Sequence, residues 1–212
     1  MSVTPDREAE SAVQPTVAPP SGIANPAPLG LAAFALTTFL LSAANAHWMK
    51  GNATGDAWVP YALAYGGIAQ FLAGMWEFRN RNVFGATAFS TYGAFWIGLF
   101  FYVRLVAPTA PLKTAFLTHD LAWILLAFAI FNTYMLLLST QVNMAVFGVF
   151  LTLEITEIVL FIGNFAVNTT IIHIGGYIGI ITALVAWYTS AAGVANGVGG
   201  RVKLPTGKAP LA

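Results

Sequence analysis

The chain has 212 residues, of which 58% are hydrophobic and 8% are charged, and its mean hydropathy is +0.73. Soluble domains carry about 25% charged residues, so this composition excludes an ordinary soluble domain and indicates a protein whose solvent is the lipid bilayer. The formal net charge of +1 gives no basis for nucleic-acid binding. The chain contains no cysteine, which excludes disulfides and cysteine-ligated metals.

Residues 1–24 differ in composition from the rest of the chain. Asp6, Arg7, Glu8 and Glu10 are mixed with small polar residues and prolines, and no apolar run as long as a signal peptide precedes Leu29. Such a segment cannot bury enough apolar surface to fold. We therefore predict a disordered N-terminal tail over residues 1–24, which acts as a tether or, alternatively, as a regulatory tail.

A double-proline motif, Asn25-Pro26-Ala27-Pro28-Leu29-Gly30-Leu31, joins this tail to the first long apolar segment. Neither proline donates a backbone hydrogen bond, and each disfavours helix in the residue before it. The motif is either a helix start capped by Asn25 or an irregular backbone at the mouth of a membrane helix, whose polar groups need protein or water partners.

Six apolar stretches of about 20 residues follow, the length that crosses a bilayer. We predict an all-α membrane protein, with a six-transmembrane-helix bundle over residues 25–198 and a basic C-terminal tail over 199–212. Dense small residues, such as Gly175 and Gly179 or Gly193 and Gly197, predict close helix packing. The spans are Leu29–Trp48, Trp58–Trp76, Phe84–Val106, Thr118–Leu138, Met144–Gly163 and Ile171–Val194.

The distribution of lysine and arginine predicts the orientation. With six spans, the two termini and the second and fourth loops share one side. That side holds Arg7, Arg79, Arg81, Arg201, Lys203 and Lys208, and the other side holds Lys50, Arg104 and Lys113. The excess favours cytoplasmic termini in a multi-pass protein of the cell membrane.

Two carboxylates lie in the middle of the fifth span, and ionisable residues at membrane depth are functional candidates. Glu154 and Glu157 are three positions apart, so they share one helix face. Because two adjacent charges repel, we expect one of them to keep its proton near neutral pH. The pair is therefore either a proton carrier or a structural pair that fixes helix contacts.

Three further polar residues are ambiguous. Gln70 in the second span either binds a carboxylate or bridges helices. Glu77 is expected to form an interfacial ion pair with Arg79 or Arg81, and His173 is expected to be a satisfied interface histidine rather than a proton relay.

The sequence contains no phosphate-binding loop, zinc motif or nucleophile elbow. We therefore predict a protein that is not an enzyme and needs no cofactor or metal. The remaining classes are channel, secondary transporter, receptor and scaffold.

Several motifs in order resemble the acetate uptake transporter family, which includes the bacterial succinate–acetate permease and fungal acetate and ammonia-export relatives. They are the double-proline motif, Tyr65-Gly66-Gly67-Ile68-Ala69-Gln70, Ala73-Gly74 with Glu77, Asn82-Val83-Phe84-Gly85, Thr87-Ala88-Phe89, Tyr92-Gly93-Ala94-Phe95-Trp96, Gly163-Asn164, and Ile171-Ile172-His173 with Gly176. The resemblance covers residues 24–204.

The resemblance implies a homohexamer in which each six-helix protomer has its own path for small monocarboxylates. It also implies a hydrophobic constriction, which by position consists of Phe34, Tyr92 and Leu153. Such a constriction gates by wetting and drying. Asn25, Gln70 and Asn164 are the candidate vestibule and substrate-binding residues.

The sequence is compatible with three functions. The first is uptake of acetate, with succinate as an alternative substrate, by a channel-like or proton-coupled permease. The acidic pair beside Leu153 and the lack of a mid-span cation favour proton-linked uptake or passage of the neutral acid over a simple anion path. The second is a channel for a neutral or weakly basic solute such as ammonia, and the third is a non-transporting sensor or scaffold.

Overall fold

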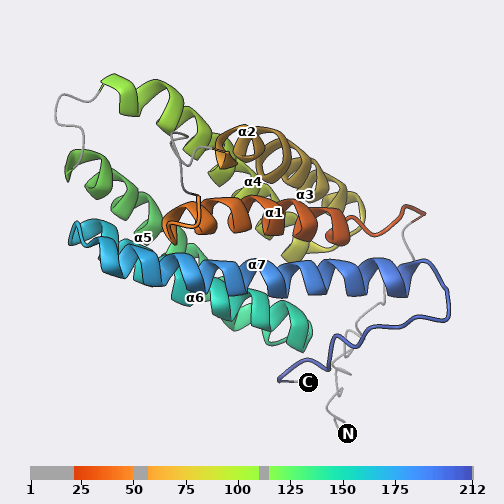
Figure 1. Ribbon diagram of the computed structural model, residues 1–212. Helices are drawn as coiled ribbons and strands as arrows, with labels where there is room; N and C mark the ends of the chain where they lie inside the picture. Colours follow the sequence, from red (N-terminus) through yellow and green to blue (C-terminus); the bar gives the residue numbers. More distant parts are fainter. Residues whose placement is uncertain (1–21, 50–56, 110–114, 212) are drawn as a thin grey trace, which may run out of the picture.

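The computed structural model describes residues 22–49, 57–109 and 115–211. The predicted tail over residues 1–24 lies almost entirely outside these ranges. The described residues form a bundle of helices that run side by side, with α7 packed along α1 and α6 (Figure 1). The helices are α1 (Ala27–Asn45), α2 (Trp58–Leu63), α3 (Gln70–Arg79), α4 (Val83–Phe101), α5 (Ala115–Ser139), α6 (Met144–Phe165) and α7 (Thr169–Gly197).

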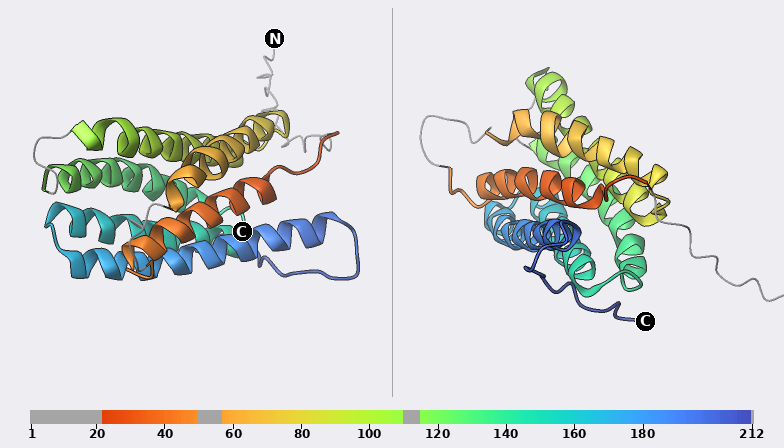
Figure 2. Two further views of the ribbon diagram at one scale, coloured as in Figure 1. Left: turned by 45° about the horizontal axis from the view of Figure 1, so that its top comes forward. Right: turned by 90° about the vertical axis from the view of Figure 1, so that its right-hand side faces the viewer.

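The predicted all-α membrane bundle is confirmed. Within the described residues, five helical segments are long and apolar enough to cross a membrane, namely those of α1, α4, α5, α6 and α7. The sixth segment is composite, because α2 and α3 are joined end to end by a π-helix over Ala64–Ala69. A second π-helix, Tyr102–Val106, extends α4, and a short 3-10 turn, Ala107–Thr109, follows it. The side-by-side and end-on views in Figure 2 show the helices packed as one bundle.

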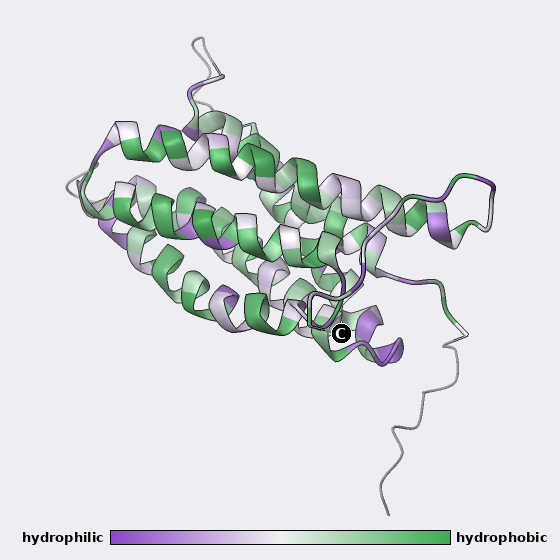
Figure 3. Ribbon diagram, turned by 90° about the horizontal axis from the view of Figure 1, so that it is seen from below, coloured by the Kyte–Doolittle hydropathy of each residue, from purple (hydrophilic) through white to green (hydrophobic). Residues whose placement is uncertain are grey.

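Large hydrophobic side chains are exposed along the outer faces of the bundle. Leu137 is 66% exposed and Ile130 is 64% exposed, both on α5. Figure 3 shows hydrophobic residues along most of the helix lengths and hydrophilic residues mainly toward the ends and connections. Such outer faces are stable only against lipid or other apolar surfaces, so the protein is a multi-pass membrane protein.

The π-helix in the second segment is packed tightly against its neighbours. A Cβ on Gly66 would lie 2.6 Å from Oγ1 of Thr37 on α1, and a Cβ on Gly67 would lie 2.8 Å from the Ile97 side chain on α4. Thr37 is fully buried, and its hydroxyl donates to the carbonyls of Ala33 (3.0 Å) and Tyr61 (3.4 Å). Single π-turns of this kind are frequent at functional sites, and this one ends at Gln70.

The double-proline motif docks the start of α1 on α7. Ser190 donates to the carbonyl of Pro28 (2.6 Å), and Gly193 leaves room for the Pro28 ring, which a Cβ would approach to 2.8 Å. The helix is capped by Pro26, while the exposed Asn25 side chain accepts a hydrogen bond from the backbone N–H of Ala27 (3.0 Å). The expectation that Asn25 is the N-cap residue of α1 is therefore wrong, because Pro26 holds that position and Asn25 forms a turn just ahead of it.

Most of the small residues that the sequence singled out lie at close crossings. A Cβ on Gly175 would lie 2.5 Å from the Leu160 side chain, and one on Gly179 would lie 2.2 Å from the Ser42 hydroxyl. In contrast, no atom lies within 4 Å of where a Cβ on Gly197 would be. The predicted pair of Gly193 and Gly197 therefore packs only through Gly193.

The C-terminal segment folds back along the bundle instead of leaving it. Asn196 donates to the carbonyl of Leu204 (2.9 Å) and accepts from the same residue's N–H (3.1 Å). The N–H of Ala145 donates to the carbonyl of Thr206 (2.9 Å), and the N–H of Leu211 donates to the carbonyl of Thr140 (3.1 Å). The segment thereby links the end of α7 to the turn between α5 and α6.

The predicted ion pair of Glu77 is not formed. Glu77 is fully buried, and its Oε2 accepts a hydrogen bond from Nδ2 of Asn80 (2.9 Å), whereas Arg79 and Arg81 are exposed. Gly85 packs directly over this carboxylate, where a Cβ would lie 2.9 Å from Oε1. The tight α3–α4 turn thus places Glu77 inside the bundle, away from the arginines next to it in sequence.

Candidate functional site

The three residues assigned to a constriction meet in the middle of the bundle, although they come from three helices. Phe34 of α1, Tyr92 of α4 and Leu153 of α6 are all buried in one hydrophobic cluster. The rings of Phe34 and Tyr92 pack edge to face, with 5.7 Å between their centroids. Together the three side chains form a common wall between two cavities.

On one side of this wall lies a cavity of about 50 Å³, here called the central cavity. By the same measure a water molecule needs roughly 10–15 Å³, so the cavity has room for a few waters. Its polar lining consists of hydroxyl, amide and carboxyl side chains. It is lined by Phe34, Thr38, Leu41, Ser42, Asn45, Tyr92, Phe95, Trp96, Leu125, Leu153, Thr156, Glu157 and Leu160.

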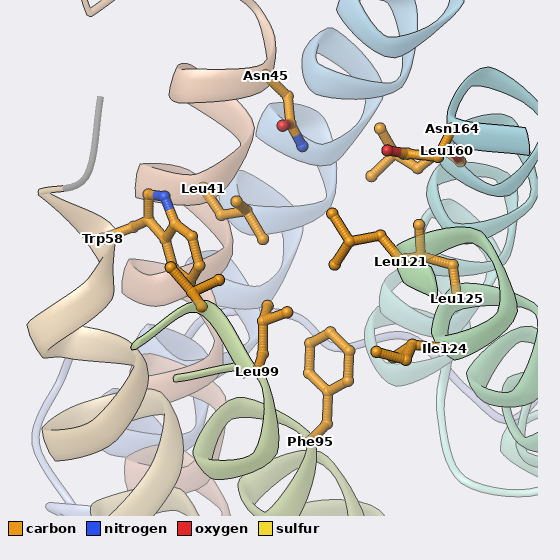
Figure 4. Close-up of a pocket in the computed structure, with 11 residues that line it drawn as sticks. Leu41, Asn45, Trp58, Phe95, Leu99, Leu121, Ile124, Leu125, Leu160 and Asn164 are labelled. Carbon is orange, nitrogen blue, oxygen red and sulfur yellow. Dashed lines mark hydrogen bonds between the residues drawn. The ribbon is translucent and has the colours of Figure 1, made fainter. Parts of the chain in front are cut away.

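A second cavity of about 90 Å³, the asparagine cavity, adjoins the central cavity and shares Leu41, Asn45, Phe95, Leu125 and Leu160 with it. Figure 4 shows Asn45 and Asn164 beside this space, with Leu121, Leu99 and Phe95 around it. The Asn164 Nδ2 donates to the carbonyl of Leu160 (2.8 Å). The asparagine cavity lies among the end of α1 and the beginnings of α2 and α5.

On the opposite side of the wall lies a smaller cavity of about 20 Å³, the glutamine cavity, which Phe34, Tyr92 and Leu153 also line. Gln70 is its polar lining residue. Gln70 is 1% exposed, and its Oε1 has no hydrogen-bond partner in the part of the chain that the structure describes. A buried oxygen without a partner costs about 1–3 kcal/mol, so Gln70 is an unusual residue beside this otherwise apolar space.

The two carboxylates of α6 have different surroundings, which corrects the expectation that they act as one adjacent pair. Glu157 lies at the central cavity, and its Oε1 is 3.2 Å from the Tyr92 hydroxyl. Glu154 turns toward α5, where its two oxygens accept hydrogen bonds from Asn132 Nδ2 (2.7 Å) and Thr133 Oγ1 (2.8 Å). The Tyr92 hydroxyl also contacts Asn132 Oδ1 (3.0 Å), so Tyr92 and Asn132 stand between the two carboxylates.

Three polar atoms at the central cavity have no partner within the described residues. They are the hydroxyl of Thr38, Oε2 of Glu157 and the indole N–H of Trp96, and all three side chains are nearly inaccessible from outside. A hydroxyl that can donate and a carboxyl group that can hold a proton are suited to bind a small carboxylic acid or a water molecule.

The other predicted residues lie away from the constriction. Asn25 is exposed at the start of α1 and lines none of these three cavities. His173, expected to be satisfied, has an Nε2 without a hydrogen-bond partner, and its ring packs on that of His47 with 4.0 Å between centroids. Groups of three or more potential metal ligands are absent from the described ranges.

Sequence reasoning missed four polar residues of the site. Asn132 and Thr133 on α5 hold the carboxylate of Glu154, while Thr38 and Asn45 on α1 line the central cavity. Thr38 follows Thr37, Asn132 and Thr133 are consecutive, and Asn45 ends its helix, so these are small polar groups within apolar stretches, a pattern that marks helix contacts or polar sites in membranes. That signal was present, but only the fold shows that these residues converge.

Comparison with known proteins finds relatives that are named for membrane transport. It is 37% identical over 186 residues to the succinate-acetate/proton symporter SatP of Escherichia coli, a match that covers 88% of this chain and 96% of SatP. It is 37% identical over 188 residues to acetate permease A of Emericella nidulans, covering 82% of this chain and 62% of the permease.

A third relative is named for a different solute. The ammonia transport outward protein 2 of Saccharomyces cerevisiae is 36% identical over 185 residues, which cover 84% of this chain and 64% of that protein. The chain thus spans less than two thirds of the length of these fungal relatives.

The fold also matches a solved structure. The bacterial acetate channel SatP superposes with a TM-score of 0.79 and 34% sequence identity, covering 87% of this chain and 99% of the channel. The model of the GPR1/FUN34/yaaH family matches residues 9–210. The resemblance inferred from the motifs is therefore confirmed: this chain belongs to the GPR1/FUN34/yaaH family.

Proposed function

We propose that this protein transports small monocarboxylates, chiefly acetate, across the membrane through a path inside each subunit, with the dicarboxylate succinate as a candidate second substrate. The observation that carries the proposal is the shared wall of Phe34, Tyr92 and Leu153, which separates the central cavity from the glutamine cavity. A wall of mainly apolar side chains closes by excluding water and opens by small side-chain movements. The names of the symporter, permease and channel relatives support the same substrate class.

In this proposal the path runs from the asparagine cavity through the central cavity to the glutamine cavity. Asn45 and Asn164 offer amide groups at one end, and Gln70 offers a free carbonyl at the other. No lysine or arginine lines any of these three cavities. The exposed Asn25 belongs to the entrance beyond the glutamine cavity, because it precedes Leu31, which lines that cavity.

Proton coupling is assigned to Glu157 and not to Glu154. A bare carboxylate of the substrate and an ionised Glu157 repel each other in a cavity of low dielectric, so passage is favoured when either the substrate or Glu157 holds a proton. Glu157 presents a partnerless oxygen to the cavity, whereas both oxygens of Glu154 are bonded to α5. Glu154 then has a structural role.

The assembly and location follow the same proposal. The protein is a homohexamer in the plasma membrane, with cytoplasmic termini, a tethering tail over residues 1–24 and a cytoplasmic segment over 199–212. The exposed Arg79, Arg81, Arg201 and Lys203 support this orientation, because they belong to connections on the same predicted side. The apolar outer faces, exemplified by Leu137 and Ile130, are available to lipid and to neighbouring subunits.

Export or passage of ammonia is the second candidate function. The name of the yeast relative supports it, and so does the absence of a basic side chain from the linings of the three cavities. A neutral small base needs no counter-charge, whereas an acid is helped by the proton of Glu157.

Uptake of labelled acetate into proteoliposomes separates the candidates. We expect uptake above that of empty vesicles, faster with an inward proton gradient, and inhibited by unlabelled acetate or propionate but not by ammonium. Ammonium uptake above that of empty vesicles, together with no acetate uptake in either gradient direction, supports ammonia transport instead. If neither solute moves and the Phe34 and Tyr92 variants alter only a partner interaction, the protein is a sensor or scaffold.

A further inference from the structure

The hydroxyl group of Tyr92 has one hydrogen atom but contacts two oxygens. It lies 3.0 Å from Oδ1 of Asn132 and 3.2 Å from Oε1 of Glu157. A phenol donates one hydrogen bond and accepts others through its oxygen. Both contacts are therefore hydrogen bonds only if one of the two neighbours donates to Tyr92.

Asn132 cannot be that donor. Its Nδ2 lies 3.0 Å from the backbone carbonyl of Phe150 and 2.7 Å from Oε2 of Glu154. A carbonyl oxygen only accepts, so the amide nitrogen must face Phe150 and the amide oxygen must face Tyr92. Asn132 is fully buried, which leaves the side chain no alternative partner in water.

We propose that Asn132 is a positioning residue that makes the closed arrangement of the Tyr92 constriction depend on a proton carried by Glu157. When the Tyr92 hydroxyl donates its hydrogen bond to Asn132, the contact between Glu157 and Tyr92 is a hydrogen bond only if Glu157 is protonated and donates to the phenol oxygen. When Glu157 loses that proton, the charged carboxylate becomes the stronger acceptor. Tyr92 then turns its hydrogen to Glu157, and the Asn132 oxygen is left buried without a donor.

Glu154 and Thr133 complete the hydrogen-bond network around Asn132. Glu154 holds the amide of Asn132 in place, and Thr133 occupies the second oxygen of Glu154. The titratable side chains around Glu157 are Tyr92 of α4 and Glu154 of its own helix. The neighbouring residues of the other helices are uncharged, namely Thr38 and Ser42 of α1 and Asn132 and Leu125 of α5. The lining of the central cavity includes no residue of α2, α3 or α7.

This inference rests on the proposed transport function, because it assigns the proton donor of that path. It is nevertheless a statement about hydrogen bonds, and it is tested without transport. The test uses infrared spectra of the purified full-length protein, recorded over a series of pH values without substrate. The carbonyl band of a protonated carboxyl group is assigned to Glu157 by its loss in Glu157→Gln.

Two substitutions are expected to move that band in opposite directions. Asn132→Leu removes the second acceptor that competes with Glu157 for the Tyr92 hydrogen, so the ionised form of Glu157 is favoured. The Glu157 band should then disappear at a pH lower by about one unit, the equivalent of one hydrogen bond. Tyr92→Phe removes the donor to the ionised form, so the band persists to higher pH. Thr133→Val is the matched control, because it removes a hydrogen bond of Glu154 without touching Tyr92 or Asn132.

The proposal is overturned if the Glu157 band is absent from the wild-type protein at every pH, or if Asn132→Leu leaves its pH dependence unchanged. If Asn132→Leu does not fold, Tyr92→Phe decides, and the absence of a shift to higher pH overturns the proposal. A correct band pattern in a protein that takes up no acetate would contradict the transport function while leaving the hydrogen-bond assignment intact.

Discussion

The ring of Phe34 on α1 meets the ring of Tyr92 on α4 edge to face, with 5.7 Å between the centroids and 62° between the planes. The two residues lie on different helices, and with Leu153 they separate two cavities. Aromatic pairs of this geometry contribute about 0.5–1.5 kcal/mol beyond the burial of their area. The contact therefore stabilises the closed wall, and its loss has consequences for both stability and flux.

Phe34→Ala is expected to open the wall between the central and glutamine cavities. We predict that uptake of a bulkier monocarboxylate such as butyrate rises severalfold relative to acetate, while the folded protein is destabilised by about 3–5 kcal/mol, as for other buried phenylalanines. The measurement is the ratio of the two uptake rates in proteoliposomes. Phe165→Ala is the control, because Phe165 packs on His119 and Trp123 at the end of α6 and lines none of these cavities. An unchanged ratio in Phe34→Ala would contradict a constriction at this position.

The two glutamates are expected to differ in their effect on coupling. Glu157→Gln should abolish the acceleration of acetate uptake by an inward proton gradient, because an amide cannot carry the proton. Glu154→Gln keeps an oxygen to accept from α5, so the gradient dependence should remain. The initial uptake rate with and without the gradient is compared for each variant, after checking that assembly is normal. Loss of the gradient response only in Glu154→Gln would reverse our assignment.

Gln70→Leu is expected to act in opposite directions on stability and on transport. The substitution removes a buried oxygen that has no partner within the described residues, which should raise the free energy of unfolding by about 1–3 kcal/mol. It also removes the amide oxygen that can accept a hydrogen bond from the neutral acid, so acetate uptake should fall by about tenfold, the equivalent of one hydrogen bond. Thermal unfolding in detergent and uptake are measured on the same preparation. A stability loss with normal uptake would show that Gln70 only bridges helices.

Gly176→Ala is expected to disrupt the packing of α7 on α1. The added Cβ would lie 2.5 Å from the backbone nitrogen of Ala46 and 2.8 Å from the carbonyl oxygen of Ser42, and backbone atoms cannot move aside as a flexible side chain does. We predict a destabilisation of about 1–3 kcal/mol, typical of overpacking. Gly197→Ala is the matched control on the same helix, because that position is open. Equal melting temperatures for the two variants would contradict the close crossing.

Asn196→Ala is expected to release the C-terminal segment from α7. The side chain makes two hydrogen bonds to the backbone of Leu204, and both are lost in the variant. We predict faster trypsin cleavage after Lys203, because a protease needs an extended, detached backbone, while the melting temperature changes little. Val198→Ala is the control, since Val198 is 73% exposed near the same helix end. Cleavage at the wild-type rate in Asn196→Ala would show that other contacts hold the segment.

Much of the architecture could be predicted from the sequence, because the bilayer imposes its own length and polarity on each helix. The apolar stretches and the residues that mark the family are identifiable in the sequence itself, whereas the constriction of Phe34, Tyr92 and Leu153, which the resemblance implies, stays a prediction. The same physical rule exposed Glu154 and Glu157 as unusual, since carboxylates at membrane depth are costly.

The sequence could not show which way each polar side chain turns. Spacing placed Glu154 and Glu157 on one helix face, but the fold directs Glu154 to Asn132 and Thr133 and leaves Glu157 at Tyr92. Sequence adjacency suggested an ion pair for Glu77, yet the α3–α4 turn buries it beside Asn80. The length and composition of each apolar segment are local properties of the chain, so they can be read directly from the sequence. Hydrogen-bond partners and cavities depend on which helices lie side by side, and only the tertiary structure decides that.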